Sequence, residues 1–276
     1  MYPQIEIFGR TIGSYGLCSV LGLIVCVSVA TWLAKKYRYA FDDVILMTLV
    51  ICGGLLVGGH LLYGVTQIRA LRDILSTVGR APAREFFGGI VNCFGGMVFY
   101  GGFLGGVIAL RVYSDRSKIL SRPHAMDLYA AMTPLFHTFG RIGCFLGGCC
   151  YGKEWHWGFS VSENPFNPSI VGVVRLPIQL IEAGCNLLIF SLILFLFLKN
   201  KFAGKLIYLY LLIYPPIRFL LEFYRGDEIR GMFLGLSTSQ WIGAGLFLFA
   251  VGTLAGKRRK ETESRSLPAG NKSGEP

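Results

Sequence analysis

Four polar residues recur at helical spacing in an otherwise apolar stretch near position 220. Tyr214, Arg218, Glu222 and Arg225 are separated by four, four and three residues, so a helix places their side chains on one face. Arginine suits phosphate because its planar fork donates two parallel hydrogen bonds. We therefore expect Arg218 and Arg225 to hold an anion while Glu222 fixes their geometry. The alternative is an Arg218–Glu222 pair that only neutralises itself.

A second group of reactive side chains surrounds Arg141. His137 lies one helical turn before it, and Cys144, Cys149 and Cys150 follow it. The arginine either reaches out to the membrane surface or approaches a lipid headgroup. The cysteines are interpreted as packing residues, as a disulfide between Cys144 and Cys149 or Cys150, or as redox-active thiols. We expect no metal site, because C-x4-C-C is not a standard zinc spacing.

A third element is the segment from Arg175 to Glu182. Gln179 and Glu182 are three residues apart and share a face of the helix that this segment predicts.

The composition shows what kind of molecule must position these groups. Of the 276 residues, 53% are apolar and only 16% are charged, and the mean hydropathy is +0.53. Soluble domains carry about 25% charged residues, so this chain cannot cover a water-facing surface. Disordered, collagen-like and soluble enzyme classes are excluded. The composition predicts an all-α integral membrane protein, and the net charge of +11 does not indicate nucleic acid.

Seven segments are long and apolar enough to span a bilayer, which takes about 20 residues each. The predicted spans are residues 13–34, 43–64, 88–110, 124–140, 176–198, 205–223 and 236–255.

The Lys and Arg residues in the connections predict the orientation of this seven-helix bundle. Alternate connections together with the C-terminal tail carry 16 cations on one side, against 10 on the other. The positive-inside rule places the more basic side in the cytoplasm and the N-terminus outside. Residues 256–276 read as a basic tail, which we expect to be disordered.

Glycines mark where helices approach one another. Gly88 to Gly106 contains four Gly-Gly pairs, and Gly54 and Gly58, like Gly101 and Gly105, have GxxxG spacing. This spacing predicts close helix contact. It also offers a thin-walled face for lipid chains or a substrate peptide.

Several of these segments, in order, resemble the motifs of one family, the bacterial prolipoprotein diacylglyceryl transferases. The resemblance covers about residues 5–255. Its motifs are residues 14–16 (SYG), 95–102 (GGMVFYGG), 140–145 (GRIGCF), 176–182 (LPIQLIE) and 218–225 (RFLLEFYR).

The resemblance implies a transferase domain over residues 1–255 in a multi-pass protein of the bacterial plasma (inner) membrane. It implies transfer of a diacylglyceryl group from phosphatidylglycerol to the lipobox cysteine of a signal-peptide-bearing preprolipoprotein, with glycerol-1-phosphate leaving. Membrane lipids would be further partners. No cofactor and no nucleic acid are implied.

The same resemblance suggests site residues. Arg141 corresponds to an essential arginine of the family. We expect it to form the catalytic group together with Tyr100 and with His137, which its own position one helical turn before Arg141 suggests. The expected substrate-binding residues are Arg218, Glu222, Tyr214, Arg225, Tyr15, Gln179 and Glu182.

The chain departs from the family pattern at several of these positions. Tyr100 stands where the family has a histidine, Cys144 where it has an asparagine, and Leu176 where it has a histidine. Either the field of Arg141 and Arg218 ionises the acceptor thiol, with help from His137 or His60, or the acceptor has changed. Other hypotheses are a relative that moves lipid to another acceptor, a non-catalytic lipid-binding protein, and a thiol-redox protein.

Overall fold

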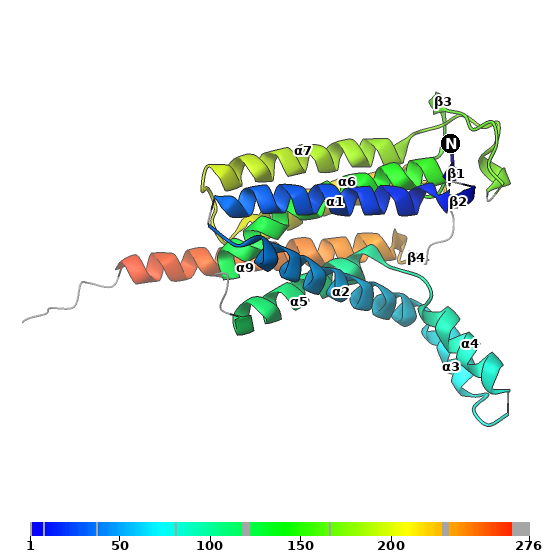
Figure 1. The fold of residues 1–276 in the computed structure, drawn as a ribbon, viewed down its shortest axis with the longest axis horizontal. Coiled ribbons are helices and arrows are strands. Elements are labelled where there is room, and N and C mark those ends of the chain that lie inside the picture. Colours follow the sequence, from blue (N-terminus) through cyan, green and yellow to red (C-terminus); the bar gives the residue numbers. More distant parts are fainter. Residues whose placement is uncertain are drawn as a thin grey trace, which may run out of the picture.

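Long α-helices form most of the molecule (Figure 1). The structure is a computed structural model that describes residues 2–7, 9–36, 38–80, 82–117, 122–165, 167–227 and 232–266. Its helices are α1 (Ser14–Lys35), α2 (Phe41–Thr66), α3 (Ile68–Leu75), α4 (Ala83–Phe94), α5 (Phe99–Ser117), α6 (Arg122–Gly147), α7 (Ile178–Leu198), α8 (Leu206–Glu222) and α9 (Thr238–Ser266). The short strands are β1 (Gln4–Ile7), β2 (Arg10–Gly13), β3 (Glu154–Phe159), β4 (Met232–Phe233) and β5 (Leu236–Ser237).

Helix α6 organises the bundle. It packs against α1, α7 and α8, while α2 pairs with α5 and α8 with α9. The hydrophobic core includes the fully enclosed residues Ala125, Ala130, Ala131, Ile193 and Ala250. The α3–α4 hairpin projects away from the body of the molecule (Figure 1). Small residues in the centre of the bundle let its helices come close enough to hold polar side chains between them.

Within the described residues, four helices are long and apolar enough to cross a membrane: α1, α2, α7 and the Thr238–Gly256 part of α9. The count becomes five if α4 and α5 are taken together as one broken span. Helix α8 has only 17 residues, and α6 carries polar residues along much of its length. The prediction of a helical membrane protein is confirmed.

The predicted third span, residues 88–110, is wrong as a single helix. Helices α4 and α5 meet at an angle of 83° across the break between Phe94 and Phe99. The His60 Nδ1 atom lies 2.7 Å from the Phe94 carbonyl oxygen and 2.9 Å from that of Gly96. The backbone N–H of Val98 donates to the Gly59 carbonyl at 3.2 Å. Because α2 supplies these partners, the backbone can leave the helix here without losing its hydrogen bonds.

The two prolines of α8 do not interrupt it. Pro215 and Pro216 both lie inside one continuous helix from Leu206 to Glu222. Each proline removes one backbone hydrogen bond. Tyr214 and Pro215 are buried against neighbouring helices, while Pro216 is exposed, and such packing makes proline tolerable in a membrane helix.

Helix α9 extends further than its predicted span. It continues to Ser266, so residues 256–266 are helical where the sequence suggests a disordered tail. This segment is rich in Lys, Arg and Glu, which are strong helix formers. Residues 267–276 of the predicted tail lie outside the described residues.

The connection from α6 to α7 folds over the end of α8. Lys153 N–H donates to the Tyr224 carbonyl at 2.9 Å, and Gly226 N–H donates to the Tyr151 carbonyl at 2.9 Å. A Cβ atom at Gly152 would overlap the Leu176 carbonyl. These backbone bonds hold the C-terminal ends of α6 and α8 and the start of α7 together, and the polar residues identified from the sequence lie there.

Candidate active site

Glu182 is the centre of a buried polar cluster. Its side chain is 2% exposed, and its Oε1 atom lies 3.0 Å from Arg141 Nη2. The Tyr214 hydroxyl donates to the same oxygen at 2.8 Å. Arg218 Nε and His137 Nε2 lie 3.7 and 3.8 Å from it. One carboxylate on α7 therefore gathers two arginines, a histidine and a tyrosine from α6 and α8.

A second carboxylate continues the cluster along α8. Glu222 forms an ion pair with Arg218 one turn earlier, and its Oε2 atom lies 3.9 Å from Arg225 Nε. The Ser239 hydroxyl of α9 donates to Glu222 Oε1 at 2.9 Å. The Arg218–Glu222 pair expected as the simple alternative is thus present, and it forms one part of a larger network.

Arg225 has a partner that the sequence analysis missed. Its Nε and Nη2 atoms donate to Asp227 at 2.8 and 2.6 Å. Burial disfavours the charged guanidinium, but the hydrogen bonds of Asp227 outweigh this, so the pKa of Arg225 lies above its usual value. Arg225 is therefore already bidentately paired with a carboxylate, and less of its charge is available to an anion than that of Arg141 or Arg218.

Ser239 was also missed, although the sequence contains a signal for it. Ser237 N–H donates to Gln240 Oε1 at 2.8 Å, and Gln240 N–H donates back to Ser237 Oγ at 3.3 Å. This reciprocal pair is a capping box of the pattern S-x-x-Q. It fixes the first turn of α9 and so holds Ser239 beside Glu222.

Several buried polar side-chain atoms at this site have no hydrogen-bond partner among the described residues. They are Arg141 Nε, Arg218 Nη1, His137 Nδ1 and the Tyr100 hydroxyl. A buried donor left unpaired costs about 1–3 kcal/mol. Two of these atoms belong to guanidinium groups, whose preferred acceptors are carboxylate and phosphate oxygens. The cluster can therefore accept an anionic oxygen ligand without breaking the bonds already present.

Aromatic rings enclose the cluster on one side. The ring of Phe99 stacks on His137 with centroids 4.1 Å apart, and Tyr210 stacks on Tyr214 at 5.4 Å. Tyr100 is 5% exposed, and its ring lies 5.7 Å from that of Phe99. The break between α4 and α5 places Phe99 and Tyr100 at the start of α5, where they reach the cluster.

The structure brings most of the predicted site residues together and separates three. Arg141, His137, Glu182, Tyr214, Arg218, Glu222 and Arg225 form one connected network. Gln179 donates to the Cys149 carbonyl at 2.9 Å and so supports the α6–α7 connection. Tyr15 is 51% exposed at the start of α1. His60 holds the α4–α5 break.

None of the eight cysteines forms a disulfide within the part of the chain that the structure describes. The Sγ atoms of Cys144, Cys149 and Cys150 nevertheless lie within 4.8 Å of one another. Hydrogen bonds from the Cys144 and Cys149 thiols lower the pKa of Cys150, because they stabilise its thiolate. The disulfide that was one of the three interpretations of these cysteines is not formed in the structure, but the three thiols are neighbours.

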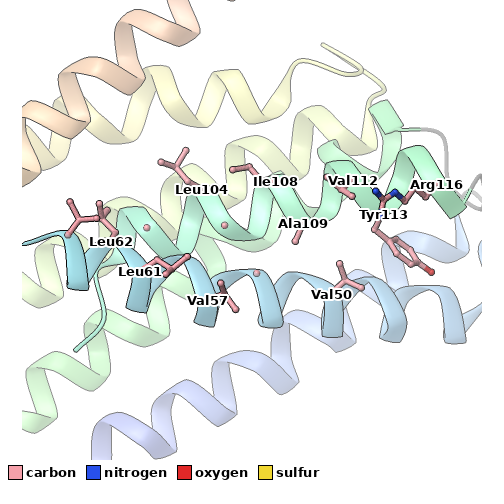
Figure 2. Close-up of a pocket in the computed structure, with 15 residues that line it drawn as sticks. Val50, Val57, Leu61, Leu62, Leu104, Ile108, Ala109, Val112, Tyr113 and Arg116 are labelled. Carbon is pink, nitrogen blue, oxygen red and sulfur yellow. The ribbon is translucent and has the colours of Figure 1, made fainter. Parts of the chain in front are cut away.

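Helices α2 and α5 meet through their glycines. A Cβ atom at Gly54, Gly58, Gly101 or Gly105 would overlap the backbone of the opposite helix, which confirms the close contact predicted from the GxxxG spacing. A groove of about 750 Å³ runs along this contact and is lined almost entirely by apolar side chains. Figure 2 shows Tyr113 and Arg116 at one end of it and Leu61 and Leu62 at the other.

Comparison with known proteins places the chain in a family. A family model described as prolipoprotein diacylglyceryl transferase matches residues 4–255. The chain is 34% identical over 259 residues to the phosphatidylglycerol–prolipoprotein diacylglyceryl transferase of Clostridium tetani, covering 89% of this chain and 95% of the relative. It is 33% identical over 269 residues to phosphatidylglycerol–prolipoprotein diacylglyceryl transferase 2 of Clostridium perfringens, covering 93% and 96%. The chain therefore belongs to the prolipoprotein diacylglyceryl transferase family.

Proposed function

We propose that this protein transfers a diacylglyceryl group from phosphatidylglycerol to the cysteine thiol of a prolipoprotein. The observation that carries the proposal is the buried Arg141–Glu182–Arg218 cluster, in which both arginines keep an unpaired N–H donor. In the reaction the acceptor thiol loses its proton to water, a sulfur–carbon bond forms and the carbon–oxygen bond to phosphate breaks. Glycerol-1-phosphate leaves with the electron pair. The leaving phosphate gains charge, and preorganised cationic donors stabilise charge that develops in a transition state.

The cluster suggests a role for each residue. Arg141 and Arg218 bind the phosphate through their unpaired donors. Glu182 holds both guanidinium groups in place and keeps them from repelling each other. Tyr214 and His137 orient Glu182, and Tyr100 contributes its unpartnered hydroxyl to the phosphate oxygens. Glu222 positions Arg218 from the other side.

The substrate-binding surfaces lie around this cluster. Tyr15, exposed at the start of α1, contacts the lipid or peptide substrate. The groove between α2 and α5 takes the acyl chains, because it is apolar and Gly101 at its wall directly follows Tyr100. Gln179 and Arg225 support the site through their bonds to Cys149 and Asp227.

We further propose seven membrane spans within a transferase domain of residues 1–255. Helices α6 and α8 are the additional spans, because they are packed between α1, α7 and α9 and hold the buried polar cluster. Lys and Arg counts support an external N-terminus and a cytoplasmic C-terminus in the bacterial plasma membrane. The partners are phosphatidylglycerol, membrane lipids and signal-peptide-bearing prolipoproteins.

A direct transfer assay tests this function. The protein is purified in detergent with phosphatidylglycerol and a fluorescent peptide that carries a lipobox cysteine. We expect a diacylglyceryl mass increment on the peptide, and none on a peptide with serine in place of cysteine. An increment that is absent with phosphatidylglycerol still bound would show that the acceptor is different.

A further inference from the structure

The end of α6 brings two cysteines together through a defined backbone motif. Gly148 has a φ of +72°, and its N–H donates to the Phe145 carbonyl at 3.3 Å. The Cys149 N–H donates to the Cys144 carbonyl at 3.1 Å. This bond pair defines a Schellman motif, in which the residues at the positions of Cys144 and Cys149 contact each other. The C-x4-C spacing, which matches no standard zinc pattern, is therefore the spacing of two neighbours at a helix end.

Cys150 lies next to these two cysteines because hydrogen bonds from neighbouring residues fix the turn that contains it. Cys150 has a φ of +56°, in the left-handed region that L-residues rarely adopt. Gln179 Nε2 donates to the Cys149 carbonyl at 2.9 Å, and Asn167 Nδ2 donates to that of Gly148 at 3.5 Å. Strained conformations of this kind persist where surrounding contacts determine them, and they gather at functional sites.

The three sulfur atoms match the first coordination shell of a thiophilic cation. Zn–S bonds of about 2.3 Å in a tetrahedron place the sulfur atoms about 3.8 Å apart, and the Sγ atoms already lie within 4.8 Å of one another. Cys144 is buried and Cys149 is exposed, so the cluster can be reached from the surface. Arg141 lies one turn before Cys144 on the same helix face, where its charge favours thiolates.

We propose that Cys144, Cys149 and Cys150 bind one Zn²⁺ ion, and that its open fourth position takes the acceptor thiol. Three protein ligands with one open position are the arrangement of catalytic rather than structural zinc. This role rests on the proposed function, while binding of the metal does not. A zinc ion that deprotonates the acceptor thiol would also remove the need for a strong base, which fits Tyr100, a weak base, at the position where the family has a histidine.

The step balances without a redox partner. The acceptor thiol coordinates zinc and releases its proton to water, because a thiol bound to zinc is deprotonated. The bound thiolate sulfur forms a bond to the glyceryl carbon, and the carbon–oxygen bond to phosphate breaks. Glycerol-1-phosphate leaves with that electron pair, next to Arg141 and Arg218. Zinc keeps its oxidation state throughout.

Metal content is the first test. The full-length protein, purified from cells grown with zinc, is analysed by mass spectrometry of its metals. We expect about one zinc per chain in the wild type and less than about a tenth in Cys149→Ser and Cys150→Ser. Cys149 is exposed, so its variant should keep the fold. The matched control is Cys52→Ala in α2, which should retain the metal. Wild-type zinc no higher than in Cys149→Ser would overturn the site.

The fourth position is tested with a spectroscopic probe. In protein reconstituted with Co²⁺, the three cysteine thiolates give sulfur-to-cobalt charge-transfer absorption, and addition of the lipobox peptide should change the visible ligand-field bands and increase this absorption. The serine peptide should leave the spectrum unchanged. Bands that do not respond to the cysteine peptide would overturn the assignment of the acceptor.

The two proposals fail in different ways. Undiminished transfer in Cys149→Ser and Cys150→Ser, with no zinc bound to them, would overturn the role of zinc in holding the acceptor thiol and leave the proposed function standing. Zinc binding and a cysteine-dependent cobalt spectrum without transfer would support the site and count against the proposed reaction. A pair of cysteines that resists alkylation until reduced would replace the metal site with a disulfide.

Discussion

The cluster around Glu182 and the contact between α2 and α5 are packed in opposite ways within one bundle, the first through charged side chains and the second through glycines. In the cluster, long charged side chains from α6, α7 and α8 meet through ion pairs and hydrogen bonds. Along α2 and α5, Gly54, Gly58, Gly101 and Gly105 bring the two backbones into close contact. The first region holds groups that can do chemistry, whereas the second holds two helices together with no chemistry of its own.

The difference lies in how each region would respond to substitution. Three arginines face three carboxylates in the extended cluster, so every loss leaves a buried partner uncompensated. The glycine contact contains no charged groups. A substitution weakens it when the new side chain overlaps the opposite helix. Changes in the cluster should therefore reduce transfer beyond their effect on stability, while changes in the glycine contact should reduce stability first.

The largest expected effect is that of Arg141→Ala. Removal of one preorganised donor to developing charge lowers a rate by about 10²–10³-fold, and this residue also leaves Glu182 partly unpaired. The measurement is the rate of diacylglyceryl transfer to the lipobox peptide. Arg84→Ala, an exposed arginine on α4, is the control and should keep the full rate. Undiminished transfer in Arg141→Ala would contradict the proposed mechanism.

Glu182→Gln should come next. The amide keeps the shape but removes the charge that holds Arg141 and Arg218, and misplacement of such groups by about 1 Å costs about 10²-fold in rate. The loss of a buried ion-pair partner should also lower unfolding stability by about 3–5 kcal/mol. Thermal unfolding in detergent measures the second effect. A Glu182→Gln protein with both the rate and the stability of the wild type would show that this carboxylate does not organise the site.

Gly58→Val tests the other side of the comparison. Its side chain would overlap the Gly101 carbonyl across the contact, and overpacking of this kind costs about 1–3 kcal/mol. Gly53→Val on the same helix is the matched control, because a Cβ atom there meets nothing within 4 Å. We expect a lower unfolding temperature only for Gly58→Val, with a smaller loss of transfer than in Arg141→Ala. Equal stability of the two variants would remove the role assigned to the glycine contact.

The smallest effect is expected for Tyr100→Phe. The hydroxyl has no hydrogen-bond partner among the described residues, so its loss breaks no bond in the resting structure. Transfer should fall by no more than about threefold, which corresponds to about 0.7 kcal/mol. A loss as large as that of Arg141→Ala would make Tyr100 an obligatory acid or base.

The sequence supports much of the site because helical spacing is a local property. Tyr214, Arg218 and Glu222 recur every four residues, so any helix must place them on one face. His137 and Arg141 follow the same rule on α6. The pairing of Asp227 with Arg225 could not be predicted in this way, because both residues follow the end of α8 and helical spacing does not apply there. The S-x-x-Q pattern at Ser237 indicates where α9 begins, but it does not indicate that Ser239 lies beside Glu222 of another helix.

Contacts between segments far apart in the chain could not be predicted in this way. No period indicates that Glu182 of α7 rather than Glu222 of α8 would be the centre of the cluster. The break before Phe99 depends on His60, which lies 34 residues away and supplies the hydrogen bond to the Phe94 carbonyl.

The sequence by itself determined the helical membrane class, the polar helix faces and the glycine contact, because composition and short-range period encode them. Only the tertiary structure decided that α4 and α5 form a broken pair, that Glu182 joins Arg141 to Arg218, and that three cysteines meet at the end of α6. The physical reason is that these features depend on which carbonyls, charges and thiols come within hydrogen-bonding distance after packing. Such distances are set by neighbouring helices and not by the local chain.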